Sequence, residues 1–222
     1  MKELERIERM IVESGGREGA VFLARNSNLP PKLLVSSFTV LPHSTYKDFI
    51  AKLKLKSSSY DRVVYVGLVG KPGRGKTLAA VKYYTHLLAA GKRSRPLFLT
   101  AYELLDYYKG RIELHRFAVS EVEISSWFEA RGSSADTEEV VPFSQLTRKY
   151  DLILVDDLVE EAYEAFEKLC HLAYTTDTLV IFTTNEDPVE ALSPRIQSRF
   201  FEAALMIDFD DFPYLRQVRR LK

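Results

Sequence analysis

The sequence predicts an α/β fold in which five parallel strands form a sheet between two layers of helices. Short, continuously apolar runs alternate along the chain with segments of helical periodicity, and continuous apolarity is typical of strands that are buried on both faces. Helices between such runs supply the crossover connections that parallel strands require. The expected strands are residues 63–69, 96–100, 152–157, 179–185 and 204–209, and the expected helices are residues 77–91, 101–110, 160–176 and 193–200.

The 222 residues are enough for one core with appendages. We expect residues 1–60 to form an N-terminal arm or linker with short helices, and residues 61–222 to form the core, with an insertion around 111–142. Within the arm, helical spacing is confined to residues 2–13 and 45–55. The glycines and prolines between these two segments predict no long element there.

Composition narrows the class of protein without naming a partner. The 31 Lys and Arg residues balance the 31 Asp and Glu residues, so the chain as a whole is not a basic coat for nucleic acid. This balance does not exclude a local basic patch. No apolar stretch is long enough to be a signal peptide or to span a membrane, so we expect a cytoplasmic protein with no membrane partner. The single cysteine, Cys170, lies on the apolar side of an expected helix, which favours core packing over a reactive thiol.

A phosphate-binding motif follows the first expected strand. The segment GKPGRGKT, residues 70–77, fits G-x-x-x-x-G-K-[ST] at every fixed position. Glycines let backbone N–H groups approach phosphate oxygens, and the following helix points its positive end at the anion. Lys76 is expected to reach the β and γ phosphates, and Thr77 to bind Mg²⁺. The expected nucleotide-binding residues are Gly70, Lys71, Pro72, Gly73, Arg74, Gly75, Lys76, Thr77 and Leu78. An accidental glycine-rich turn is the alternative, and the flanking strand and helix argue against it.

Two carboxylates end the third expected strand. In LILVDD, Asp156 and Asp157 follow four apolar residues, which places them at the carboxyl edge of a parallel sheet, where nucleotides bind in open α/β folds. We expect Asp156 to hold Mg²⁺ and Asp157 to orient or deprotonate the attacking water. An acidic pair that only favours the next helix N-terminus is the alternative.

Two further segments complete the candidate site. Asn185 ends the fourth expected strand, where an amide can position water; a helix cap is the alternative. Arg195 and Arg199 lie four residues apart on one helical face. An arginine can stabilise charge that develops on the γ-phosphate, and one of these two could serve the site of a neighbouring subunit. Ordinary salt bridging is the alternative.

With these four elements in order, residues 36–210 resemble the AAA+ ATPases, and within them the DnaC/IstB group of helicase loaders and transposition helper ATPases. The resemblance implies a P-loop NTPase core of five parallel strands whose small helical lid is reduced or absent, since few residues follow the last strand. It assigns Lys76 and Thr77 to Walker A, Asp156 and Asp157 to Walker B, Asn185 to sensor I, and Arg199 to the arginine finger. Val159 stands where the family commonly has glycine.

The resemblance also implies a function. Lys76, Asp157, Asn185 and Arg199 would be catalytic, Thr77 and Asp156 would bind Mg²⁺, and ATP binding would drive homo-oligomerisation. The implied partners are DNA, with single strands favoured, and a replicative helicase or a transposase. Candidate DNA contacts are Tyr108, Lys109, Arg111 and Arg116, together with the basic clusters at 52–56, 92–95 and 216–220. For each cluster taken alone, the residues favour the alternative of a solvated charged surface. The alternatives are a nucleotide-dependent switch or adaptor with negligible hydrolysis, and a small-molecule or nucleotide kinase.

Overall fold

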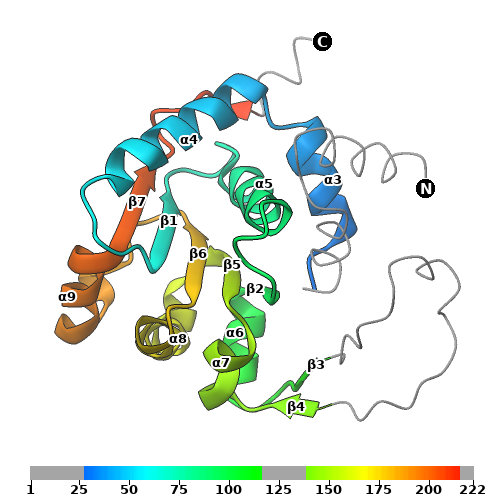
Figure 1. The fold of residues 1–222 in the computed structure, drawn as a ribbon, viewed down its shortest axis with the longest axis vertical. Coiled ribbons are helices and arrows are strands. Elements are labelled where there is room, and N and C mark those ends of the chain that lie inside the picture. The colour runs from blue at the N-terminus through cyan, green and yellow to red at the C-terminus, as the bar shows by residue number, and fades with distance from the viewer. Residues whose placement is uncertain (1–27, 117–138, 216–222) are drawn as a thin grey trace, which may run out of the picture.

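The computed structural model describes residues 28–116 and 139–215. Five parallel strands form the main sheet in the order β2-β5-β6-β1-β7 (Figure 1), which confirms the predicted architecture. The strands are β1 (Tyr65–Val69), β2 (Pro96–Thr100), β5 (Leu152–Leu158), β6 (Leu179–Thr184) and β7 (Ala204–Asp208). Because all five strands run the same way, the ends of β1, β5 and β6 meet at one edge of the sheet.

Helices cover both faces of this sheet (Figure 1). On one face lie α3 (Pro31–Thr39), α4 (His43–Ser57) and α5 (Lys76–Ala89). On the other lie α6 (Ala101–Tyr108), α7 (Leu146–Lys149), α8 (Tyr163–Thr176) and α9 (Pro194–Ala203). Short 3-10 turns at Phe143–Gln145, Glu160–Ala162 and Val189–Ala191 precede α7, α8 and α9 respectively.

One expectation about the first sixty residues is wrong. Helix α3 occupies part of the segment for which the glycines and prolines predicted no long element. Pro31 stands at the first helical position, where its missing N–H is not needed and its fixed φ suits the helix. The expected helix at residues 2–13 lies outside the described residues. Helices α3 and α4 pack into the same apolar cluster as α5 through Leu34 and Phe49, and the predicted domain boundary at residue 60 stays a prediction.

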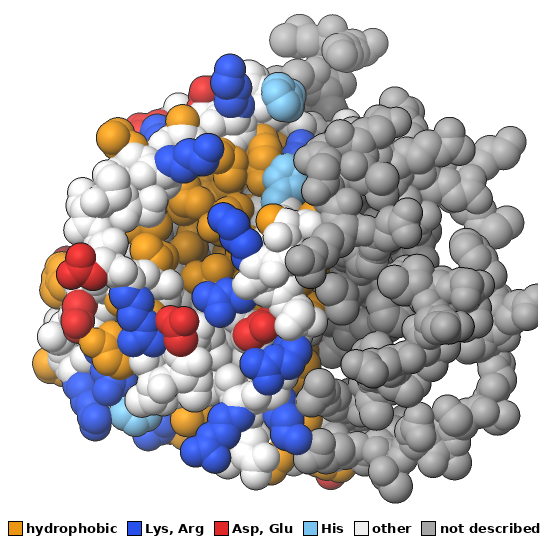
Figure 2. Space-filling model, in the orientation of Figure 1, with side chains coloured by type: hydrophobic (Ala, Val, Ile, Leu, Met, Phe, Trp, Pro, Cys, Tyr) orange, Lys and Arg blue, Asp and Glu red, His pale blue; other side chains and the backbone are white. Residues whose placement is uncertain are grey.

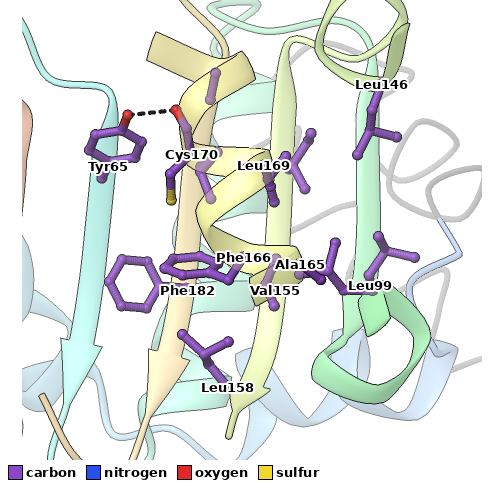
Figure 3. Close-up of a cluster of buried hydrophobic side chains, with 14 of the residues drawn as sticks. Tyr65, Leu99, Leu146, Val155, Leu158, Ala165, Phe166, Leu169, Cys170 and Phe182 are labelled. Atoms are coloured by element: carbon purple, nitrogen blue, oxygen red, sulfur yellow. Dashed lines mark hydrogen bonds between the residues drawn. The ribbon is translucent and has the colours of Figure 1, made fainter. Parts of the chain in front are cut away.

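The second apolar cluster lies between the sheet and α8 (Figure 3). Phe166 on α8 meets Phe182 of β6 with ring centroids 4.9 Å apart. The Tyr65 hydroxyl donates a hydrogen bond of 2.8 Å to the carbonyl oxygen of Cys170. Cys170 is fully buried in this cluster, which confirms its predicted core position, and burial raises the pKa of its thiol.

The expected insertion at 111–142 is described only at its ends. There, β3 (Leu114–Arg116) and β4 (Glu139–Val141) form an antiparallel pair separate from the main sheet. The buried Tyr107 of α6 donates a hydrogen bond to the Val141 carbonyl, which ties this pair to the core. None of the described helices is both long and apolar enough to cross a membrane.

Candidate functional site

The loop between β1 and α5 takes the backbone shape that its glycines allow. Gly70, Gly73 and Gly75 have φ values of 138°, 85° and 89°, in a region that residues with a Cβ rarely adopt. Gly75 is the N-cap of α5, and Lys76 begins the helix. The loop therefore lies at the positive end of a 14-residue helix, an arrangement that favours a bound anion.

Lys76 folds its side chain into this loop. Its ammonium donates hydrogen bonds to the Gly70 carbonyl, to the Lys71 carbonyl at 3.1 Å and to the Asn185 side-chain oxygen at 3.0 Å. Only 7% of Lys76 is exposed. Burial lowers the pKa of the ammonium, and the nearby carboxylates of Asp157, Asp210 and Asp156 oppose that shift. The structure thus brings together Lys76 of the loop and Asn185 at the end of β6.

Thr77 and Asp156 meet directly beside the loop. The Thr77 hydroxyl donates a 2.8 Å hydrogen bond to Asp156 Oδ1, and Thr183 donates a 2.6 Å bond to the same oxygen. Burial raises the pKa of the Asp156 carboxyl, and the two hydroxyl donors partly offset the effect. A hydroxyl and a carboxylate are hard oxygen ligands of the kind that Mg²⁺ prefers, so these two side chains fit the predicted metal site.

Asp157 has an unusual backbone. Its φ is 56°, which a non-glycine residue adopts at some cost, although aspartate tolerates it better than most. The pairing of β5 with β6 shifts register between Val155 and Leu158, so a bulge lies at the two carboxylates. The Asp157 N–H donates a 2.8 Å hydrogen bond to Thr183 Oγ1, and the Asp157 side chain is exposed. The bulge therefore separates the environments of the two neighbours, with Asp156 held by hydroxyls and Asp157 open to solvent.

The turn after these carboxylates does not need the glycine common in the resembled family. Val159 has φ −125° and ψ 160°, an extended conformation that any residue adopts.

The described contacts of Arg199 are with α8 and do not include the loop. Its guanidinium donates a 2.6 Å hydrogen bond to His171 Nδ1 and lies 4.6 Å from the centre of the Tyr174 ring. Arg195 on the same helix is exposed. The structure thus assembles the loop, the carboxylates and Asn185 within one chain, while its contacts leave Arg199 apart from them.

Two contributors to the site were not predicted. Thr183 joins the two carboxylate residues through its hydroxyl, and Asp210, beyond the last strand, accepts a 2.8 Å hydrogen bond from the Lys71 N–H. Thr183 carries a signal in hindsight, because it precedes Asn185 by two residues on a strand that ends at the same edge. No sequence pattern points to Asp210, because its position beside the loop depends on the strand order, which places β7 next to β1.

Several residues proposed for DNA contact have acidic partners in the described structure. Lys52 pairs with Asp211 at 2.8 Å and Arg111 with Asp106 at 3.2 Å. The Tyr108 hydroxyl donates a 2.9 Å hydrogen bond to Glu164. On the face shown in Figure 2, lysine and arginine side chains are spread among acidic and hydrophobic ones. Residues 216–220 lie outside the described part of the chain.

No protein-family model and no curated protein matches this sequence. Solved structures do match it. The AMPPCP-bound DnaA from Aquifex aeolicus is similar at a TM-score of 0.48 and 15% identity, over 81% of this chain and 50% of that one. The DnaC helicase loader is similar at a TM-score of 0.45 and 14% identity, over 75% of this chain and 91% of that one. Domain III of DnaA from Thermotoga maritima is similar at a TM-score of 0.45 and 15% identity, over 80% of this chain and 68% of that one.

The architecture rests on this chain's own elements, a five-stranded parallel sheet between helices with a glycine loop that leads from β1 into α5. The fold is that of a P-loop nucleotide-binding α/β protein. DnaA and the DnaC loader are its structural neighbours. This chain spans about half the length of the Aquifex DnaA structure.

Proposed function

We propose that this chain binds ATP with Mg²⁺ at the loop of residues 70–78 and hydrolyses it. The observation that carries the proposal is the 2.8 Å hydrogen bond between Thr77 and Asp156, beside an ammonium that is folded into the loop. Thr77 and Asp156 would hold Mg²⁺ with the phosphates, and Lys76 would exchange its carbonyl partners for phosphate oxygens. The metal would neutralise charge that develops on the phosphates.

Hydrolysis requires groups that act on the attacking water. Asp157, which is exposed at the bulge, would orient or deprotonate that water, and Asn185 would help to position it. Because the contacts of Arg199 are with α8, we propose that it acts on the nucleotide of a neighbouring copy. The complete site would then form only in a homo-oligomer, which ATP binding would stabilise.

The proposed action on DNA comes from the family resemblance. In this proposal the chain is a cytoplasmic, helicase-loader-like or DNA-remodelling ATPase, or a transposition helper. It would bind single-stranded DNA and engage a replicative helicase or a transposase. Residues 61–222 would form the ATPase core, and residues 1–60 would form the N-terminal arm or linker.

The test is phosphate release from MgATP, with and without single-stranded DNA, by the full chain and by Lys76→Ala. We expect turnover that DNA increases and that Lys76→Ala abolishes, since the loop loses its ammonium. Lys47→Ala, at an exposed lysine on α4 outside the candidate DNA-contact clusters, is the matched control and should keep full turnover. Full MgATP hydrolysis by Lys76→Ala would show that the site has been wrongly assigned.

The position of Arg199 also favours a second candidate, a nucleotide-dependent switch or adaptor with negligible hydrolysis. The two candidates separate in a mixing experiment. Arg199→Ala and Lys76→Ala should each be inactive, and a mixture should regain part of the turnover if the arginine acts between subunits. ATP-dependent assembly without phosphate release, at any protein or DNA concentration, would favour the switch.

A further inference from the structure

The segment that follows β7 lies against the phosphate-binding loop. We call residues 209–215 the strap. It begins with a 2.7 Å hydrogen bond from the Phe209 N–H to the Val69 carbonyl, at the point where β1 ends and the loop starts. From there the strap contacts the loop at four successive places, although about 140 residues of sequence separate the two.

The first contact is made by Asp210. Its carboxylate accepts the 2.8 Å hydrogen bond from the Lys71 N–H and lies 3.8 Å from the Arg74 guanidinium. The Asp210 backbone also lies against the loop, since a Cβ on Gly70 would stand 3.0 Å from the Asp210 nitrogen. Asp210 therefore fixes the loop at its first turn, and Arg74 balances its charge.

The second contact joins the loop to the hydrophobic core. Arg74 Nη1 donates a 2.7 Å hydrogen bond to the carbonyl of Phe212. The Phe212 side chain is 5% exposed and packs on Phe209 with ring centroids 4.6 Å apart. Burial of this ring holds the carbonyl in place, so the Arg74 side chain has a fixed acceptor.

The last two contacts cover the glycines of the loop. The Leu215 N–H donates a 3.1 Å hydrogen bond to the Gly73 carbonyl. A Cβ on Gly73 would lie 2.6 Å from the Tyr214 ring, and one on Gly75 would lie 2.5 Å from the Leu215 side chain. The strap thus packs directly on two of the three glycines whose positive φ gives the loop its shape.

We propose that the strap, through Asp210 and Tyr214, holds the phosphate-binding loop in its anion-accepting shape before the nucleotide arrives. The inference rests on the proposed nucleotide binding at this loop. A glycine-rich loop has many backbone conformations to lose on binding, and contacts that remove them beforehand increase affinity without touching the ligand. Asp210 and Tyr214 are then positioning residues, which act through Lys71, Gly73 and Arg74.

The experiment measures MgADP affinity by isothermal titration calorimetry on the full chain and on paired variants. Asp210→Ala removes the acceptor of the Lys71 N–H, whereas Asp210→Asn keeps a side-chain oxygen there. Tyr214→Ala removes the ring over Gly73, whereas Tyr214→Phe keeps it. The loss of one such contact should weaken MgADP binding by about 3- to 10-fold in each alanine variant, and the Asn and Phe variants should bind within about twofold of the wild type.

Asp211→Ala is the matched control, because that neighbouring carboxylate pairs with Lys52 and not with the loop. It should leave MgADP affinity unchanged. Thermal unfolding with and without MgADP identifies variants that are merely less stable, since their Tm would be lower without nucleotide but would keep its MgADP-induced shift. Equal or tighter MgADP binding by the folded alanine variants would overturn the role of the strap. No MgADP binding by the wild type would instead refute the proposed function.

Discussion

Replacing Asp156 by asparagine separates the cost of burying a charge from the hydrogen bonds that the side chain accepts. Thr77 and Thr183 both donate to Oδ1 of Asp156, and an asparagine Oδ1 has two lone pairs for the same two hydroxyls. Asp156→Ala leaves both hydroxyls without this acceptor, at about 1–3 kcal/mol for the two bonds together. We therefore expect Asp156→Asn to have a free energy of unfolding about 1–3 kcal/mol above that of Asp156→Ala.

The comparison with the wild type gives the sign of the charge effect. Burial raises the pKa of Asp156 above its ordinary 3.8, so the folded protein holds this proton more tightly than the unfolded chain does. The ionised carboxylate consequently lowers stability, by an amount that is absent below about pH 3.8 and complete above the raised pKa. Asp156→Asn should accordingly be more stable than the wild type near pH 7, and this advantage should vanish as the pH falls.

The measurement is urea unfolding of the three proteins at several pH values, without nucleotide and with EDTA to remove metal ions. Phosphate release is measured in parallel, and both variants should lose it because the proposed Mg²⁺ ligand is gone. A wild type more stable than Asp156→Asn at pH 7, or an advantage that does not depend on pH, would refute the reasoning. A more stable wild type would mean that the hydrogen bonds from the two hydroxyls stabilise the carboxylate by more than its burial costs.

Three further changes test the core and the site. Phe166→Ala should lower the free energy of unfolding, measured by urea titration, by about 3–5 kcal/mol, because it opens a cavity in the second cluster. Phe201→Ala is the control, because its ring is 75% exposed. It should change the free energy of unfolding by less than about 0.5 kcal/mol. Gly67→Ala should cost about 1–3 kcal/mol by overpacking, since the new Cβ would lie 2.5 Å from the Phe182 ring; an unchanged urea midpoint would show that the ring moves aside freely. Thr183→Val should cost about 1–3 kcal/mol and reduce phosphate release, because the hydroxyl joins the two carboxylate residues; unchanged release would remove it from the site.

The sequence was sufficient for the parts of the fold that depend on local patterns. Continuous apolar runs gave the five strands because strands buried on both faces have no polar side to alternate. The loop and the carboxylates could be placed for a related reason, since each follows directly on a strand and parallel strands end at one edge. The sequence does not predict helix α3, because proline usually interrupts a helix, although at the first helical position it favours one.

The interactions between distant segments could not be predicted in the same way. The Arg199 contact with His171 and Tyr174 depends on how α9 packs on α8, and no sequence spacing encodes that packing. The strap was missed because its position depends on the strand order, which places β7 next to β1. The bulge at Asp157 likewise arises from a register shift between two strands and not from a turn signal in the sequence.

In the described structure, the strand that leads into the phosphate-binding loop pairs on both sides with strands that come more than 100 residues later in the sequence. β1 pairs with β6 at Val180–Thr184 on one side and with β7 at Ala204–Asp208 on the other. Contacts across more than 100 residues form late and slowly, because the intervening chain must first be brought together. During synthesis, β1 and its loop would therefore lack both neighbouring strands until residues 179–208 had left the ribosome. Nucleotide binding by chains of increasing length should thus begin abruptly, once β7 is complete.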